Sequence, residues 1–147
     1  MILRFAFVAI AVLVSGCDKI PGTNAHLIKK AERSAANELI DPTSAMFRNE
    51  SVHGKAVCGE INGKNRMGAY AGFTRYFYLE GVADALIDPQ ADPSDEASAE
   101  DLCTSVQSNE YSSASLIQSA CQRAAEEKLK QALQDSFNSR WQTVCEK

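Results

Sequence analysis

The sequence lacks the signatures of several protein classes. Its 147 residues include 15 Lys or Arg against 19 Asp or Glu, so it has no basic excess of the kind that a general nucleic-acid binder needs. It contains no G-x-S-x-G, H-E-x-x-H, G-x-G-x-x-G or P-loop motif. No apolar run reaches the roughly twenty residues of a spanning helix. We therefore expect a single-domain protein that is not an enzyme, with no cofactor and no nucleic-acid partner.

The first sixteen residues have the pattern of an export signal. Arg4 precedes an apolar run over residues 5–14, which has the length of a signal-peptide hydrophobic region. The segment Val14-Ser15-Gly16-Cys17 then resembles the lipobox of bacterial lipoproteins. In that family the cysteine thiol receives a diacylglycerol and the preceding peptide is removed. The resemblance implies that Cys17 is lipidated, and two or three acyl chains would anchor the chain stably.

The same resemblance implies a location and a division of the chain. A lipoprotein of this kind is anchored to the cell membrane and faces the periplasm. Asp18, directly after the cysteine, resembles the inner-membrane retention signal of enteric bacteria, which favours the inner over the outer membrane. We divide the chain into a signal peptide (1–16), a lipidated tether (17–24) and one domain (25–147).

Four further cysteines remain in the domain, and an oxidising compartment favours two disulfides. They are Cys58, Cys103, Cys121 and Cys145. No C-x-x-C or H-x-x-x-H pair occurs, and His26 and His53 are isolated, so we expect no metal site.

A predicted C-terminal helix restricts how these cysteines can pair. An apolar stripe at helical spacing runs from Leu116 to Val144, after a cap at Ser112 or Ser113. Cys121 and Cys145 would lie about 36 Å apart on this helix, whereas a disulfide needs Cα atoms within about 7 Å. We favour Cys103–Cys121 with Cys58–Cys145, which closes an acidic segment locally. The alternative is Cys58–Cys121 with Cys103–Cys145.

The remaining patterns predict one more helix and a small sheet. Apolar residues at steps of three and four predict an amphipathic helix over 25–40, capped by Thr23 or Asn24. Asp41 and Pro42 predict a short turn over 43–47. Residues 52–61, 73–79 and, less clearly, 82–87 have the composition of strands. The acidic segment 88–101 predicts a surface loop that can include a helical turn over 94–106.

Together these elements predict an α+β fold. A small antiparallel sheet of about three strands would be packed on one face by the N-terminal helix and the long C-terminal helix, with two disulfides. In the strand 73–79, Phe73, Phe77 and Leu79 alternate with Tyr76 and Tyr78. We expect the two tyrosines to lie on the solvent side of the sheet.

Three central motifs resemble a group of small exported proteobacterial proteins. They are D-P-x-S-A-x-F-R-N at 41–49, V-C-G-x-[VI]-N-x-K-N at 57–65 and G-x-Y-x-G-F at 68–73. The resemblance implies no established activity. Within the second motif, Gly59 permits a β-bulge or the close approach of a helix.

The glycine-rich segment 62–72 has two interpretations. Its asparagines and glycines suit a loop whose backbone is tied by side chains. Alternatively, it forms a recognition loop made by Asn62, Lys64, Asn65, Arg66 and Tyr70. Lys64 and Arg66 would then contact a phosphate, a lipid head group or a peptide carboxylate.

The leading functional hypothesis is a non-enzymatic binding module for a periplasmic protein or envelope component. It would act through the 62–72 loop or the exposed face of the sheet. Three alternatives remain open: an immunity or superinfection-exclusion lipoprotein, a structural envelope protein, and a small envelope hydrolase. The hydrolase would use Glu60 or Glu80 and would need them to face each other across a hairpin as paired carboxylates, whereas a solvated sheet face is the far commoner place for such residues.

The lipobox generates the first prediction. Cells fed labelled palmitate should yield a labelled protein, and Cys17→Ser should abolish the label because the alkylated thiol is gone. A Cys103→Ser variant removes only a predicted disulfide and should keep the label. Label that survives Cys17→Ser would contradict the assignment.

Overall fold

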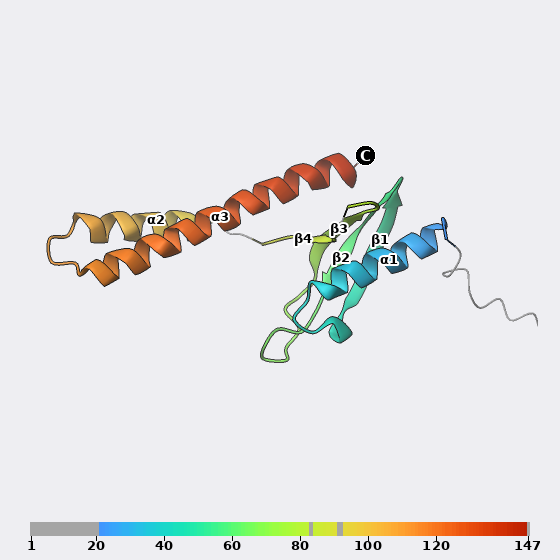
Figure 1. The fold of residues 1–147 in the computed structure, drawn as a ribbon, viewed down its shortest axis with the longest axis horizontal. Helices are drawn as coiled ribbons and strands as arrows, with labels where there is room; N and C mark the ends of the chain where they lie inside the picture. Colours follow the sequence, from blue (N-terminus) through green and yellow to red (C-terminus); the bar gives the residue numbers. More distant parts are fainter. Residues whose placement is uncertain (1–20, 83, 91–92, 147) are drawn as a thin grey trace, which may run out of the picture.

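A four-stranded antiparallel sheet with three α-helices makes up the structure, a computed structural model that describes residues 21–82, 84–90 and 93–146 (Figure 1). The strands lie in the order β1-β2-β3-β4. The α+β class is as predicted, with four strands where about three were expected. The predicted signal peptide and Cys17, the predicted lipidation site, lie outside the described residues.

Helix α1, Asn24–Asn37, packs on one face of the sheet. Thr23, one of the two predicted caps, accepts a hydrogen bond from the His26 amide through its hydroxyl (3.2 Å). Leu27, Ala31 and Ala35 recur every four residues and are buried against the sheet. Two of these three are alanines, whose small side chains let the helix lie close to the strands. The helix ends three residues before the predicted Ile40.

Strands β1, Met46–His53, and β2, Ala56–Asn62, form a hairpin. The predicted single strand over 52–61 is therefore wrong, because it spans the tight turn at Gly54 and Lys55. The predicted 43–47 turn is shorter in the structure: a single 3-10 turn, Pro42–Ser44, is capped by Asp41, and Phe47 already belongs to β1. The polar composition of Arg48-Asn49-Glu50 hides β1 from a search for apolar alternation.

A β-bulge interrupts this hairpin opposite Gly59. A bulge was one of the two roles predicted for this glycine. The register passes from Arg48 opposite Glu60 to Ser51 opposite Cys58, which leaves two β1 residues opposite Gly59. A Cβ atom at Gly59 would lie 3.0 Å from the Glu50 side chain and 3.1 Å from the Tyr76 ring. Glycine therefore makes room for these two side chains.

Strand β3, Thr74–Leu79, is covered on both faces, and β4, Leu86–Ile87, borders it. Tyr76 and Tyr78 are buried in a core with α1, while Phe77 packs against Phe137 of the C-terminal helix. The predicted alternation of β3 is correct. Two other expectations are wrong: the tyrosines do not face solvent, and the two helices cover opposite faces of the sheet. An apolar strand that is buried on both sides does not reveal which face a given helix covers.

Helices α2, Pro93–Ser108, and α3, Ala114–Val144, lie side by side as a hairpin that extends beyond the sheet (Figure 1). The acidic segment is thus mainly helical rather than a loop. Ser113, one of the two predicted caps of α3, accepts a hydrogen bond from the Leu116 amide (3.3 Å). Part of the predicted apolar stripe is exposed, including Leu129 (62%) and Leu133 (53%). Among the described residues, no helix combines the length and the apolar character needed to cross a membrane.

Two disulfides join these elements in the favoured pairing. Cys103–Cys121 links α2 to α3, with Cα atoms 4.7 Å apart. Cys58–Cys145 links β2 to the residue that follows α3, with Cα atoms 5.9 Å apart. The alternative pairing is excluded, as is a Cys121–Cys145 bridge.

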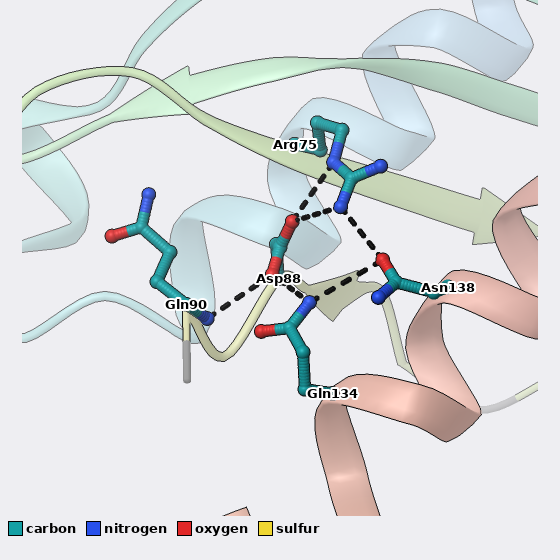
Figure 2. Close-up of polar contacts among 5 residues, drawn as sticks. All are labelled: Arg75, Asp88, Gln90, Gln134 and Asn138. Atoms are coloured by element: carbon teal, nitrogen blue, oxygen red, sulfur yellow. Dashed lines mark hydrogen bonds and ion pairs between the residues drawn. The ribbon is translucent and has the colours of Figure 1, made fainter. Parts of the chain in front are cut away.

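A polar cluster around Arg75 also attaches α3 to the sheet (Figure 2). The Arg75 guanidinium contacts the Asp88 carboxylate through Nη2 (2.6 Å) and Nε (2.8 Å). It also donates to Asn138 of α3 (2.8 Å), and Gln134 of α3 donates to Asp88 (2.6 Å). Burial raises the pKa of the Asp88 carboxyl, but the hydrogen bonds from Gln134, the Gln90 amide and Arg75 outweigh it. The net pKa therefore lies below the ordinary 3.8.

Asp88→Asn should lower the free energy of unfolding by about 2 kcal/mol at pH 7, because charge-assisted hydrogen bonds are lost. A depressed folded-state pKa stabilises the fold above the unfolded value. The gap between wild type and variant should therefore shrink as the pH falls below 3.8 and through the folded-state pKa. Urea denaturation at several pH values measures this gap.

The matched control is Glu100→Gln, which breaks an exposed pair with Lys128 (3.3 Å). Its effect should stay within about 0.5 kcal/mol, as for most exposed ion pairs. Equal losses in the two variants would contradict the structural role of Asp88.

Candidate functional site

The 62–72 loop connects β2 to β3 at the end of the sheet near the C-terminal end of α1. Leu39, just after α1, packs so closely on Gly63 that a Cβ atom there would lie 2.6 Å from the Leu39 side chain. The buried Ser44 hydroxyl accepts a hydrogen bond from the Lys64 amide (2.9 Å) and donates one to the Asp41 carbonyl (2.8 Å). The loop is therefore held against both α1 and the turn at 42–44.

Two asparagine side chains fix the backbone of the loop. The Asn65 carboxamide oxygen accepts hydrogen bonds from the amides of Met67 (3.0 Å) and Ala69 (3.1 Å). The buried Asn62 accepts one from the Gly72 amide (3.1 Å). Gly68 and Gly72 adopt positive φ angles of 77° and 108°, which favour glycine. These contacts hold the loop in one defined conformation.

The predicted recognition residues divide into two groups. Asn62 and Asn65 turn toward the loop backbone and serve the architecture. Lys64, Arg66 and Tyr70 are exposed, and the Lys64 ammonium lies 5.6 Å from the centre of the Tyr70 ring. Arg66 forms no hydrogen bond or ion pair with any described residue. The architectural interpretation thus holds for Asn62 and Asn65, and the recognition hypothesis is left with Lys64, Arg66 and Tyr70.

One exposed side chain of the loop was missed from the sequence. Met67 lies at the loop tip and is 91% exposed. Ile40 and Met46, at the same end of the sheet, are also exposed. The sequence does contain a signal for Met67. It is an apolar residue within the polar run 62–68, where neither helical nor strand periodicity predicts one.

The loop itself carries two positive charges, Lys64 and Arg66, and no acidic residue. Asp41, at the base of the loop, accepts hydrogen bonds from the Thr43 hydroxyl (2.7 Å) and amide (3.1 Å). The bond from the Thr43 side chain is the main cause that lowers the pKa of the Asp41 carboxyl, and the nearby Lys64 charge adds to it. Asp41 is already bound, whereas Arg66 is available to an anionic partner.

The two carboxylates suggested for a hydrolase are not close together. Glu60 accepts hydrogen bonds from Arg48 and Asn49 (both 2.7 Å). Glu80 pairs with Lys30 of α1 (3.5 Å), and its amide bonds to the Lys55 carbonyl. Lys55 and Glu60 are five residues apart, or about 17 Å along an extended chain. Glu60 and Glu80 therefore do not form the carboxylate pair that the hydrolase alternative needs.

A different carboxylate is partly buried near the bulge. The Tyr76 hydroxyl donates a hydrogen bond to Glu50. Burial raises the pKa of the Glu50 carboxyl, the hydrogen bond from Tyr76 opposes that rise, and nearby Glu32 adds to it. Because the Tyr76 side chain is fully buried in the α1 core, we interpret this contact as structural.

Within the part of the chain that the structure describes, no three His, Cys, Asp or Glu side chains are grouped to hold a metal ion. Comparison with known protein families, with curated proteins and with solved structures finds no match. The assignment of a site therefore rests on the geometry of this chain.

Asn65→Ala should loosen the loop without unfolding the protein. The amides of Met67 and Ala69 lose their acceptor, so their hydrogen exchange should become faster, while the free energy of unfolding changes by about 1 kcal/mol or less. The control is Asn109→Ala, since Asn109 accepts a bond from the Tyr111 amide in the α2–α3 connection (3.0 Å). Unchanged exchange at Met67 and Ala69 would show that Asn65 does not order the loop.

Proposed function

We propose that this protein is a lipid-anchored, non-enzymatic binding module on the periplasmic side of a bacterial cell membrane. Its 62–72 loop contacts an anionic surface of an envelope protein. One observation carries the proposal: the loop backbone is fixed by Asn62, Asn65 and Ser44, while Lys64, Arg66, Met67 and Tyr70 are directed outward.

The physical argument is preorganisation. A loop that already holds its conformation loses little entropy on binding, so more of the contact energy remains as affinity. Arginine, methionine and tyrosine are also enriched at protein interfaces. A rigid scaffold that presents such side chains on a loop is a common arrangement for recognition.

Helix α1 places this loop away from the proposed anchor. The tether joins α1 at Thr23, whereas the loop packs on Leu39, beyond the opposite end of the helix (Figure 1). Fourteen helical residues span about 21 Å. With Cys17 in the membrane, the loop can therefore face a partner beyond the lipid surface.

The anchor and the compartment have separate support. The lipobox resemblance at residues 14–17 favours lipidation of Cys17. The two disulfides suit an oxidising compartment such as the periplasm. Helices pack on both faces of the sheet. Of the two contact surfaces that the sequence suggested, the 62–72 loop and an exposed sheet face, we therefore retain the loop.

Site-specific photocrosslinking in intact cells tests the proposal. A photoreactive phenylalanine at Met67 should give a discrete crosslinked protein. The yield should fall at least about fivefold when Lys64→Ala and Arg66→Ala are added, because charge pairs guide the association.

The matched control carries the same photoreactive residue at Tyr111, which is 94% exposed at the tip of the α2–α3 hairpin. It should not give that product. The same product from both positions, or a product that the double substitution leaves unchanged, would rule out the loop as the contact.

A further inference from the structure

A cavity of about 270 Å³ lies between the β1–β2 hairpin and the last turns of α3. Its lining includes Glu60 and Arg75 from the sheet, Trp141 from α3, and the Cys58–Cys145 disulfide. This volume is just below the range of about 300 to 1,000 Å³ that drug-sized ligands occupy. The cavity therefore suits a smaller molecule.

Helix α3 is attached to the sheet on both sides of Trp141. Phe137 packs on Phe77, with ring centres 5.4 Å apart, and Cys145 is bonded to Cys58. Trp141 lies one helical turn from each attachment and stacks on Phe137. The indole is therefore held in place, and it lines the cavity with the Arg75 guanidinium 5.3 Å from its ring centre.

Two charged groups in the lining have unused hydrogen-bonding capacity. Glu60 and Arg75 are cross-strand partners, yet no ion pair joins them. One Glu60 oxygen, Oε2, accepts both bonds from Arg48 and Asn49, which leaves Oε1 without a described partner. Arg75 uses Nε and Nη2, and Figure 2 shows its third nitrogen free of contacts with Asp88 and Asn138.

The charges in and around the cavity balance. Arg75 is paired with Asp88, and Glu60 with Arg48. A ligand with a net charge would disturb this balance, whereas a zwitterion would not. An acceptor and a donor on neighbouring strands match a molecule that carries an ammonium and a carboxylate a short distance apart.

We propose that this cavity binds a free α-amino acid with an apolar or aromatic side chain. Its carboxylate accepts a hydrogen bond from Nη1 of Arg75, its ammonium donates to Oε1 of Glu60, and its side chain lies against Trp141. This site is separate from the loop contact and does not depend on it.

Trp141 provides the measurement, because it is the only tryptophan in the chain. Titration of L-phenylalanine into the disulfide-bonded protein should change the tryptophan fluorescence in a saturable way. Phenylalanine amide lacks the carboxylate and N-acetylphenylalanine lacks the ammonium. Each should bind at least about tenfold more weakly, since one charged group of the site stays unpaired.

Glu60→Gln should weaken L-phenylalanine binding by at least about tenfold as well, because the variant removes the charge that binds the ammonium. Glu80→Gln is the matched control, since Glu80 pairs with Lys30 and does not line the cavity, and it should bind like wild type. Circular dichroism and disulfide mapping verify that both variants fold.

Three results would overturn the proposal. The first is no saturable change up to about 10 mM L-phenylalanine, where even a 1 mM site would be mostly filled. The second is equal affinity for the amide or N-acetyl derivative. The third is unchanged affinity in folded Glu60→Gln. None of these bears on crosslinking at Met67.

Discussion

The attachment of α3 to the sheet is the constraint on which the second half of the fold depends. Helix α3 has 31 residues, or about 46 Å, but it meets the sheet mainly through residues 134–145. There Arg75 links Asp88 to Asn138 and also lies 5.4 and 5.3 Å from the ring centres of Phe137 and Trp141. The Cys58–Cys145 bridge holds the end of the same segment. Without these contacts, Phe77 and the cavity beside Trp141 would lose their cover.

The central position of β3 explains why both proposed sites lie at the margins of the sheet. Tyr76 and Tyr78 are buried under α1, and Phe77 is buried under α3, so the middle of this strand is closed to a partner on both faces. The accessible places include the loop that leads into β3 and the cavity where the hairpin meets the end of α3. Polar groups at both places have hydrogen-bonding capacity that the fold itself does not use.

The backbone is irregular at two places, in the 62–72 loop and at the bulge of the β1–β2 hairpin. Asparagine and glycine residues stabilise these irregular conformations. Asn65 satisfies two loop amides that no strand partner reaches, and Gly59 leaves room for Glu50 and the Tyr76 ring. In the loop, Asn62 and Asn65 fix the backbone that carries the exposed side chains, although both asparagines were themselves predicted to be recognition residues. This explains why sequence alone grouped all five loop residues together.

The sequence by itself determined the elements whose causes are local or geometric. Caps at Thr23 and Ser113 and the alternation in β3 follow from neighbouring residues, and the length of α3 left two possible disulfide pairings, of which the structure has the favoured one. Only the tertiary structure decided which helix covers which face, because a strand that is apolar on both sides accepts either arrangement. It also separated Glu60 from Glu80 and brought Arg75 together with Asp88 and Asn138, since these relations depend on strand register and on packing between distant segments.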